Sequence, residues 1–584
     1  MIKLKINRIK IISFFITQLF CLQSYFGQQS ISGKIVDSKT KEPLAFVSIS
    51  IDGSVNGTTT NIEGIFKIKS QNDISFISLS YVGYNPLKFF IADTTEVFIK
   101  MERKDYEFNE IKILAKENPA HRIIKLTSKN RENNNPDKIS SYKCNTYNKT
   151  HYDFVSNILP NKDSILIDSI SLKLRAFSEK SHLIMMESVT ERSYLFPNNI
   201  NENVIATKVS GFKHPNFATL ATDLQPFSFY NDYFKILGKD YLNPITSGST
   251  TKYFFNLEDT LYQGLDSVFI ISFRPFLGKN FEGLQGVLYI NTNGYAIQNV
   301  IAYPHDKGLI DVKIQQQYQF VDNKQWFPEQ LKYELHYINY PTKKTGIKLN
   351  SRSYITDVYL NPNLKKKDFN FIAVTMDPNA SSKDSVYWVN HRRDTLSIKE
   401  KTTYKIIDSI GISQNMDKKL KLMEALFSFQ LPISYFNIDI NKILKISNYE
   451  GVRGGIGLHT NDRFSKIFNV GGYLGYGYKD EEVKYGFDTR LLFKKNSKDY
   501  FIKYAYSYDI DEAARTQYFY SKNNYNRTIL NSRMDFIEQH DLSLNFRALK
   551  YFTANVSINQ STKIPTYDYT FSKDIYSTPN NPEF

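Results

Sequence analysis

Cysteine is nearly absent from this chain of 584 residues, which contains only two. Cys21 lies in an apolar N-terminal segment, so removal of that segment would leave Cys144 alone. A single cysteine cannot form an intrachain disulfide. The folded chain must therefore be stabilised by packed cores or by a membrane rather than by covalent cross-links.

Recognisable catalytic and metal-binding motifs are also missing. The nine histidines are scattered, and none stands at metal-ligand spacing from another His, Cys or Glu. There is no GxSxG and no GxxxxGK[ST] motif. The densest polar cluster, His391 with Arg392 and Arg393, is interpreted as a solvated approach to a helix. The sequence thus predicts no catalytic, cofactor-binding or metal-binding residues, and we expect a protein that is not an enzyme.

Long apolar runs are missing after the N-terminus. Residues 1–27 have the pattern of a secretory signal peptide, in which an apolar run from Ile11 to Leu22 follows four basic residues, Lys3, Lys5, Arg8 and Lys10. We expect cleavage near Gly27, and an uncleaved anchor is the alternative. No later stretch approaches the run of about 18 apolar residues that a membrane-spanning helix needs. If the mature protein lies in a membrane, it must cross as strands.

The positive charge of the chain is dispersed. The net charge is +15, but the chain contains no basic helix and no basic cluster interleaved with aromatic residues. Dispersed lysines are typical of a solvated surface, whereas nucleic-acid binding proteins concentrate their positive charge. We therefore expect no nucleic-acid partner.

Aromatic residues, by contrast, are abundant. The chain has 41 Tyr and 43 Phe, and aromatic residues make up 15% of it, while the mean hydropathy is only −0.40. Polar chains rich in aromatic residues suit alternating strands, in which one side faces water and the other buries bulky groups. The length exceeds what one core can organise. We predict a mainly β protein of several domains.

Residues 28–103 contain short apolar runs separated by turn-forming residues, which predicts a small β-sandwich. Its expected core residues are Phe46, Ile49, Ile51, Phe66 and Ile68. The segment has no histidine, so a zinc peptidase is excluded.

This segment resembles the carboxypeptidase regulatory-like (transthyretin-like) domain that precedes many outer-membrane proteins of the Bacteroidetes type. The resemblance rests on "EPLAFVSISI", "GTTTNIEGIFKI" and "LSYVGY", which ends at Tyr84, and on Gly33, Val36 and Asp37. It implies an accessory module for folding or docking, without catalysis.

Residues 104–139 are predicted to form a helical connector. Asn118 is a suitable N-cap, Pro119 suits the first helical position, and Ile123, Ile124 and Thr127 share one face.

Residues 140–375 alternate again, in longer segments, which predicts an antiparallel β meander or half-barrel with a few helices. "NTNG" at 291–294 is expected to join two strands as a hairpin. The segment "FEGLQGVLYINTNGYAIQNV" looks like a strand pair of periplasmic lipoprotein-carrier folds. Two interpretations follow: a hydrophobic cradle for lipid, or a curved sheet filled by its own side chains. We favour the second.

Residues 376–430 are predicted to be a helical linker. Ser397 and Glu400 form a capping box, and a second helical run covers 415–428. The order of sandwich, "ENPAHRII" helix and this linker resembles the DUF5686 family of Bacteroidetes, whose members have a regulatory-like domain and a C-terminal barrel. That family has prolines where this chain has Arg393 and Asp394. The family name implies no established mechanism.

Residues 431–584 are predicted to supply strands of an outer-membrane β-barrel. In "KYGFDTRLLF", Tyr485, Phe487 and Leu491 share one side, and Asp488 and Arg490 share the other. The segments have the length of about nine residues that a tilted strand needs to cross hydrocarbon, and tyrosines recur near their ends. The glycine-rich stretches "NYEGVRGGIG" and "GGYLGYGYKD" resemble the surface-antigen type of barrel.

About six strands fit between residues 450 and 560, whereas a closed barrel needs at least about eight. Either strands before residue 450 contribute, or the chain is a fragment of a longer one. We favour a fragment.

These features together predict a non-enzymatic outer-membrane protein whose N-terminal domains lie in the periplasm and take part in transport or assembly of an envelope component. Alternatives are a barrel-anchored structural or adhesion protein, and a relative of TonB-dependent receptors. Expected partners are outer-membrane lipid and, through the N-terminal sandwich, other envelope proteins.

Overall fold

The computed structural model describes residues 29–54, 57–70, 74–91, 96–104, 118–156, 169–213, 215, 217–278, 280–306, 308–342, 345–369, 373–493, 500–512, 534–549 and 552–566. Strands make up 56% and helices 16% of the structure, so the predicted mainly β fold is confirmed. The chain divides into two compact units, the first ending at Gln414 and the second beginning at Asn415. The predicted signal peptide at 1–27 lies outside the described residues.

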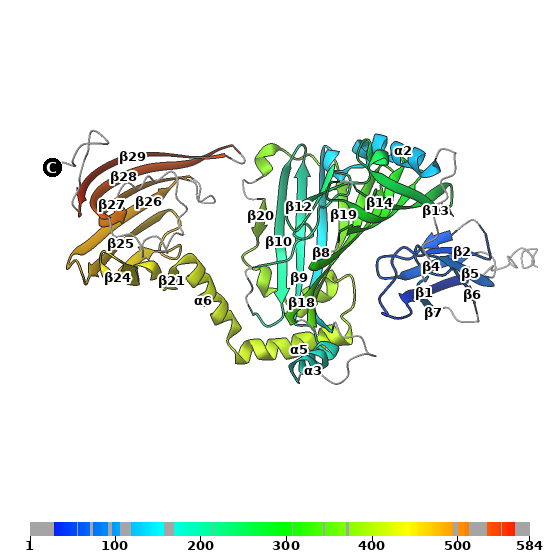
Figure 1. The fold of residues 1–584 in the computed structure, drawn as a ribbon, viewed down its shortest axis with the longest axis horizontal. Helices are drawn as coiled ribbons and strands as arrows, with labels where there is room; N and C mark the ends of the chain where they lie inside the picture. The colour runs from blue at the N-terminus through cyan, green and yellow to red at the C-terminus, as the bar shows by residue number, and fades with distance from the viewer. Residues whose placement is uncertain are drawn as a thin grey trace, which may run out of the picture. The chain divides into compact units, whose positions relative to one another are not determined.

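The N-terminal part of unit 1 is a seven-stranded sandwich (Figure 1), as predicted. Its sheets have the strand orders β4-β1-β7 and β3-β2-β5-β6. The strands are β1 (Gln29–Asp37), β2 (Ser48–Ile51), β3 (Gly57–Thr59), β4 (Ile65–Ser70), β5 (Phe76–Ser80), β6 (Leu87–Phe90) and β7 (Glu96–Met101). Ile49, Phe66 and Ile68 are buried in the core between the sheets, and Ile51 packs against it.

Phe46 does not belong to this core, and its prediction as a sandwich core residue was wrong. Its side chain is fully buried against the large sheet that follows, where its ring and that of Tyr289 lie edge to face with centroids 5.7 Å apart. The backbone at Phe46 has a φ of +64°, in the left-handed region. We infer that this turn directs the side chain out of the sandwich, so that it fixes the sandwich to the rest of unit 1.

The centre of unit 1 is an eleven-stranded, almost wholly antiparallel sheet with the order β13-β14-β15-β16-β17-β18-β19-β8-β9-β10-β20. Its strands are β8 (Ser141–Ser156), β9 (Ile184–Leu195), β10 (Asn199–Val209), β13 (Tyr253–Gln263), β14 (Asp266–Pro275), β15 (Leu284–Asn291), β16 (Ala296–Pro304), β17 (Ile310–Val321), β18 (Gln325–Thr342), β19 (Thr345–Leu360) and β20 (Val374–Met376). Strands β13 to β19 form the predicted meander, and the expected hairpin joins β15 to β16.

One face of this sheet is filled by the chain itself, in agreement with the second interpretation above. Helix α2 (Pro119–Asn134) lies on it, and Ile123 and Ile124 enter the largest buried cluster of the described residues. The predicted N-cap is confirmed, since the Asn118 side chain accepts a hydrogen bond from the Ala120 N–H at 2.9 Å. The hairpin of β11 (Tyr233–Ile236) and β12 (Lys239–Leu242) adds to the same cluster. The predicted connector is thus part of the core.

The opposite face of the sheet contacts the sandwich and helices near residue 400. Helix α4 (Ser385–His391) places Trp388 against this face, and α5 (Ile398–Ser413) packs on β9 and beside α3 (Ser169–Lys180) (Figure 1). The capping box is confirmed: the Ser397 hydroxyl accepts from the Glu400 N–H, and the Glu400 carboxylate accepts from the Ser397 N–H.

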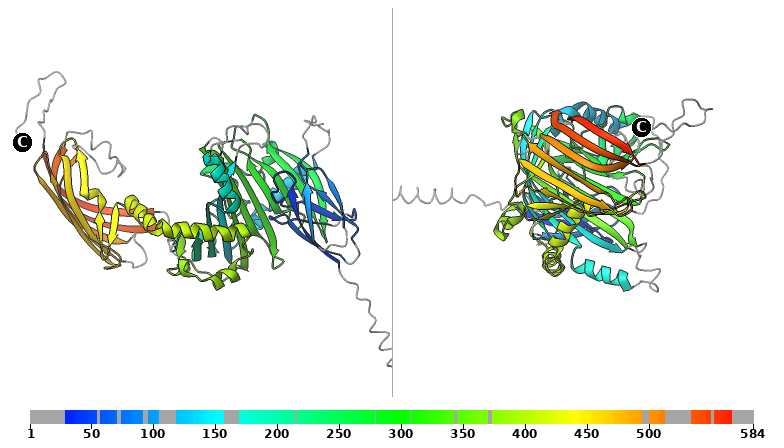
Figure 2. Two further views of the ribbon diagram at one scale, coloured as in Figure 1. Left: turned by 90° about the horizontal axis from the view of Figure 1, so that it is seen from below. Right: turned by 90° about the vertical axis from the view of Figure 1, so that its left-hand side faces the viewer.

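Unit 2 is a helix followed by one curved antiparallel sheet (Figure 2). The main path is β21-β22-β24-β25-β26-β27-β28-β29, and β23 also pairs with β24. The elements are α6 (Met416–Ser428), β21 (Gln430–Ile433), β22 (Phe436–Asp439), α7 (Ile440–Ile443), β23 (Leu444–Ser447), β24 (Gly451–Thr460), β25 (Phe468–Gly477), β26 (Val483–Leu492), β27 (Phe501–Glu512), β28 (Met534–Leu549) and β29 (Phe552–Pro565). Three short strands before residue 450 therefore join the six that were expected.

In the described part of unit 2, β21 and β29 are the two edges of the sheet and do not pair with each other. No helix among the described residues of the chain is both long and apolar enough to span a membrane.

Candidate functional site

The face of the large sheet beneath the sandwich and helix α5 buries charged side chains. Because side chains alternate along a strand, the register places the side chains of Lys332, Arg352, Lys149 and Glu187 in one row across β18, β19, β8 and β9. We call this face the polar layer. Its members are Lys149, His151, Asp153, His182, Glu187, Lys332, Glu334, Lys348, Arg352, Tyr354, Arg392, Lys399 and Glu400.

Glu187 is the most buried carboxylate of the layer, with an exposed fraction of 0%. The Arg392 guanidinium donates to both of its oxygens, from Nε to Oε1 and from a terminal nitrogen to Oε2, each at 2.7 Å. The Tyr147 hydroxyl donates to Oε1 at 2.6 Å and the Tyr404 hydroxyl to Oε2 at 2.5 Å. The four donors come from β8, α5 and the segment after α4, so this carboxylate ties the helices to the sheet.

The pKa of Glu187 reflects these contacts. Burial alone would raise the pKa, but the hydrogen bonds and charge of Arg392 and the two tyrosine hydroxyls outweigh burial and hold it below its ordinary value. Glu187 is therefore ionised at neutral pH and paired.

A second ion pair lies beside it. Lys149, only 4% exposed, places Nζ 2.9 Å from Glu400 Oε1 and 3.5 Å from Asp394 Oδ2. Burial raises the pKa of Glu400, but the charge of Lys149 and the hydrogen bonds from Lys149 and Ser397 together lower it by more, so the pKa lies below its ordinary value. Glu400 thus serves both as the third residue of the α5 capping box and as the counterion of a buried lysine, which explains why α5 begins at this point over the sheet.

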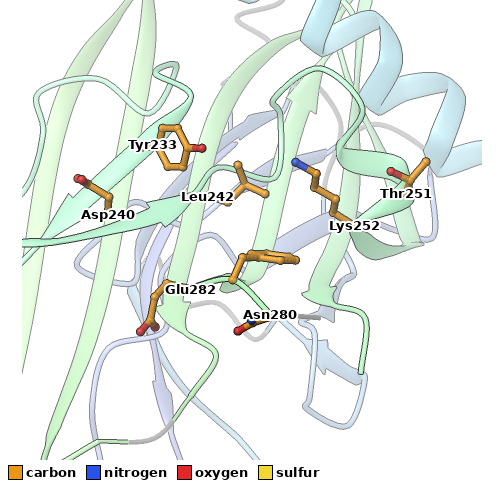
Figure 3. Close-up of a pocket in the computed structure, with 8 residues that line it drawn as sticks. Tyr233, Asp240, Leu242, Thr251, Lys252, Asn280 and Glu282 are labelled. Carbon is orange, nitrogen blue, oxygen red and sulfur yellow. The ribbon is translucent and has the colours of Figure 1, made fainter. Parts of the chain in front are cut away.

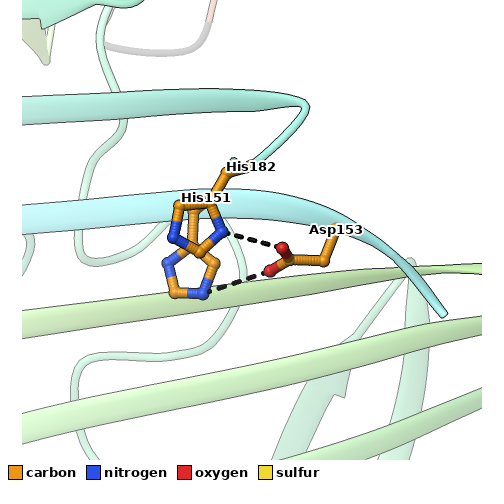
Figure 4. A group of neighbouring side chains, drawn as sticks. All are labelled: His151, Asp153 and His182. Carbon is orange, nitrogen blue, oxygen red and sulfur yellow. Dashed lines mark hydrogen bonds and ion pairs between the residues drawn. The ribbon is translucent and has the colours of Figure 1, made fainter. Parts of the chain in front are cut away.

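Two histidines and an aspartate meet at one end of the layer (Figure 4). His182 Nδ1 lies 2.8 Å from Asp153 Oδ1, and His151 Nε2 lies 3.5 Å from Asp153 Oδ2. The two rings are in contact, with centroids 4.2 Å apart and an interplanar angle of 41°. Lys399 Nζ lies 2.7 Å from Asp153 Oδ1. Burial lowers the pKa of His151 to about 3, and the nearby His182 adds to this effect.

The sandwich joins the polar layer through its acidic residues. The Tyr354 hydroxyl lies 2.7 Å from carboxylate oxygens of both Glu63, in the sandwich, and Asp394. Lys348 pairs with Glu42 of the sandwich and lies 3.3 Å from Glu334. The apolar contact of Phe46 and these polar contacts together fix the sandwich on the sheet.

Two interpretations of the sequence need correction here. Arg392 is not part of a solvated approach to a helix, because its side chain is only 12% exposed and is paired with Glu187; His391 beside it is exposed. The histidines are not all scattered, since His151 and His182 are in contact. Sequence spacing missed them because 30 residues, which include α3, separate them along the chain.

The remaining members of the layer could have been noticed from the pattern in β8. Tyr147, Lys149, His151 and Asp153 alternate with Asn148, Thr150 and Tyr152. Charged side chains on one side of a strand usually face water, whereas on β8 helices and the sandwich cover that side. The burial of these side chains depends on the helices and the sandwich that cover the strand, and the sequence of the strand alone does not show them.

A separate hollow of about 520 Å³ lies beside the hairpin of β11 and β12 (Figure 3). Tyr233, Asp240 and Leu242 line one part of it, and Thr251 and Lys252 line another. Its walls carry charges of both signs, and Glu282 pairs with Lys239 at 3.3 Å. Among the residues that line this hollow, no nucleophilic side chain is hydrogen-bonded to a general base.

We expect unit 1 to lose stability in acid. The pKa values of Glu187 and Glu334 lie below the ordinary value of 4.5, the second because Lys332 and its lysine neighbours outweigh the effect of burial. Above pH 4.5 both carboxyls are ionised in the folded and unfolded chain, and their full stabilisation is present. As the pH falls further, the unfolded chain takes up protons that the folded chain does not, and the free energy of unfolding decreases.

Fluorescence of Trp326 and Trp388 measures this, because the chain has only two tryptophans and both belong to unit 1. Denaturant midpoints recorded with EDTA present should begin to decline below about pH 6.5, because the unfolded chain protonates His151 there and the folded chain does not, and should fall more steeply below about pH 5. A midpoint that rises between pH 5 and pH 3 would contradict the assignment of these carboxylates as paired anions.

Comparison with known proteins gives two family matches. Residues 123–355 match the model of DUF5686, a family of unknown function, and residues 31–113 match that of the CarboxypepD_reg-like domain. The first match spans most of the eleven-stranded sheet, and the second covers the sandwich. No curated protein matches the chain significantly.

Among solved structures, a DUF1329 family protein from Desulfovibrio piger aligns at 10% identity over 44% of this chain and 98% of its own, with a TM-score of 0.19. OpdK of Pseudomonas aeruginosa, crystallised with vanillate, aligns at 6% identity over 73% of this chain and 94% of its own, with a TM-score of 0.11. OccAB4 of Acinetobacter baumannii aligns at 9% identity over 74% of this chain and 100% of its own, with a TM-score of 0.09. None of these likenesses supports an inference about this chain.

Proposed function

We propose that this protein, which belongs to the DUF5686 family of unknown function and has an N-terminal CarboxypepD_reg-like domain, is a non-enzymatic outer-membrane protein. The strands of unit 2 cross the lipid, and unit 1 lies in the periplasm. There it takes part in transport or assembly of an envelope component.

The observation that carries this proposal is an inverted sheet in unit 2. On β26, Phe487 is 47% exposed whereas Lys484, on the opposite side, is fully buried. In water the reverse arrangement is favoured. Val483, Tyr485 and Leu491 of β26 are exposed on the same side as Phe487. The inversion continues on the other strands of the sheet, whose exposed large apolar side chains include Val452, Ile456, Leu458, Phe468, Leu474, Tyr476, Leu542, Leu544, Val556 and Ile558. A continuous exposed apolar face of this kind suits lipid.

The opposite side of the same sheet is charged and paired. Arg453 donates to Glu450 at 2.5 Å and to Asp509 at 2.6 Å, and Lys484 pairs with Asp480. A hollow of about 470 Å³ on this side has a polar lining that includes Lys442. Charged residues on one side of the sheet and apolar residues on the other fit a barrel with a polar interior.

Strand length also supports the proposal. Strands β24, β25 and β26 have ten residues each, and β27 has twelve. A tilted strand of about 9–11 residues crosses the hydrocarbon core. Lipid cannot satisfy open strand edges, so the proposal requires that both β21 and β29 be paired when the protein is in the membrane.

A role without catalysis is supported by the polar layer of unit 1. Its carboxylates Glu187 and Glu400, which are buried, and Glu334, which is partly buried, each have a cationic partner within 3.0 Å. Such pairs position elements and leave no carboxylate free to act as a general base. The exposed outer sheet of the sandwich, where Ile65 is 46% and Phe98 59% exposed, is the surface that we assign to contact with another envelope protein.

Site-directed labelling tests the placement in lipid. Single labels at positions 487 and 491 of the full-length protein in vesicles should be quenched by a lipid-soluble probe, while labels at 488 and 490 should not. Labels at 487 and 491 that respond only to a water-soluble quencher would overturn the membrane assignment.

A deletion strain separates transport from a purely structural anchor. If the protein moves or assembles an envelope component, the lipid or protein composition of the outer membrane should change and be restored by the full-length gene but not by residues 1–414. An unchanged composition with altered surface attachment would favour the anchor.

A further inference from the structure

We propose that His151, Asp153 and His182 form a binding site for a divalent transition metal of the zinc class. The three side chains offer two imidazole nitrogens and a carboxylate, all within 4.8 Å of one another (Figure 4). Imidazole nitrogen and carboxylate oxygen are common ligands of Zn²⁺ in proteins, and three protein ligands leave a fourth position for water. The proposal does not depend on the function of unit 2.

The backbone holds the three residues in place without a metal. His151 and Asp153 are two residues apart on β8, so their side chains leave the same face of the sheet. His182 is fixed by its own N–H, which donates to Thr403 Oγ1 on α5 at 2.8 Å. The next residue, Leu183, donates its N–H to the Tyr152 carbonyl at 2.8 Å. The site is thus built on paired strands and on a packed helix, as a preorganised metal site requires.

His151 provides the observation that points to a missing ligand. Its Nδ1 atom is buried and has no hydrogen-bond partner among the described residues, and its Nε2 lies 3.5 Å from Asp153 Oδ2, at the outer limit of a hydrogen bond. Buried polar groups without partners are rare, and an unseen ion is one of the accepted reasons for them. Neither nitrogen of this ring therefore has a strong partner, and a metal between Asp153 and the two rings would supply one at Nε2, although it would not account for the unpartnered Nδ1.

The position beside Asp153 is taken by Lys399. Its Nζ atom lies 2.7 Å from Asp153 Oδ1, and its side chain is 33% exposed. A half-solvated lysine in the first turn of α5 can swing into water without unfolding anything. We infer that the ammonium group neutralises Asp153 in the metal-free protein and that a divalent ion displaces it. The lysine and the metal therefore compete.

Competition between Lys399 and the metal can be tested, because a purely structural ion pair between Lys399 and Asp153 predicts no zinc binding. Full-length protein freed of metal with EDTA and then dialysed is titrated with Zn²⁺ by calorimetry, and Co²⁺ is used as a spectroscopic substitute. We expect one bound ion, and we expect His182→Ala and Asp153→Asn to abolish binding. Lys399→Met removes the competing cation, so it should lower the dissociation constant for zinc.

Asp394→Asn is the matched control, because it changes a carboxylate that contacts Lys149 and Tyr354 of the polar layer but is not one of the three ligands, and it should leave zinc affinity unchanged. Tryptophan fluorescence and circular dichroism establish that each variant is folded. If His182→Ala does not fold, the decision rests on Lys399→Met, which keeps all three ligands. Zinc binding that is unaffected by both Lys399→Met and Asp153→Asn, or no binding by Lys399→Met at all, would overturn the proposal.

Discussion

Replacement of Glu187 by Gln is expected to destabilise unit 1 by about 3–5 kcal/mol, the cost of breaking a buried ion pair by removal of one partner. The substitution keeps the shape of the side chain but leaves the Arg392 guanidinium, which is 12% exposed, without a counterion. One amide oxygen must also replace two carboxylate oxygens that each accept two hydrogen bonds. Urea unfolding of the full-length protein, followed by tryptophan fluorescence, measures the effect because Trp388 packs beside Arg392.

Glu191→Gln is the control, since Glu191 lies on the same strand and is exposed. Exposed substitutions of this kind usually change stability by less than about 0.5 kcal/mol. The double variant Glu187→Gln, Arg392→Gln should lose less than the sum of the two single variants, because the second change removes the unpaired charge. Equal effects of Glu187→Gln and Glu191→Gln would show that the polar layer does not hold α5 on the sheet.

Phe487→Lys is the second substitution with a large expected effect. If this side of β26 faces lipid near the middle of the bilayer, a lysine there should cost about 2–4 kcal/mol of folding free energy in vesicles. Because Phe487 is 47% exposed, the same change in water would cost little. Reversible unfolding in lipid vesicles, monitored by the mobility shift of the folded form, gives the measurement.

Arg490→Gln on the opposite side of the same strand serves as the matched control, and it should cost much less. A larger loss of stability for Phe487→Lys than for Arg490→Gln indicates that position 487 faces lipid and position 490 does not. A lysine at position 487 that leaves stability in vesicles unchanged would mean that this face contacts water, and the membrane proposal for unit 2 would be wrong.

Much of the fold follows from patterns that are local in the sequence. The capping box of Ser397 and Glu400 and the N-cap Asn118 each predicted a helix start that the structure contains. The alternation around Phe487 predicted which side chains of β26 share a face. These features depend on residues within one turn or one strand, where hydrogen bonding and side-chain direction are fixed by spacing alone.

The rest depends on partners that are distant in the sequence. Strands β8 and β9 were not recognised individually, because Lys149, Thr150 and Glu187 are buried although their residue types usually lie at the surface. Phe46 was assigned to the wrong core because its side-chain direction follows from a left-handed backbone conformation that sequence alternation does not show. The contact between His151 and His182 required the structure.

The position of β8 in the large sheet has a consequence for biosynthesis. Strand β8 ends at Ser156. Its neighbour β9 begins at Ile184, after helix α3, but its other neighbour, β19, begins only at Thr345. While the intervening chain is being made, β8 has an unpaired edge that can bind another strand. Closing so long a loop is slow, because ordering it costs entropy before the contacts form. Unit 1 therefore cannot complete this sheet until β19 has been synthesised, and until then the free edge of β8 is open to incorrect strand pairing.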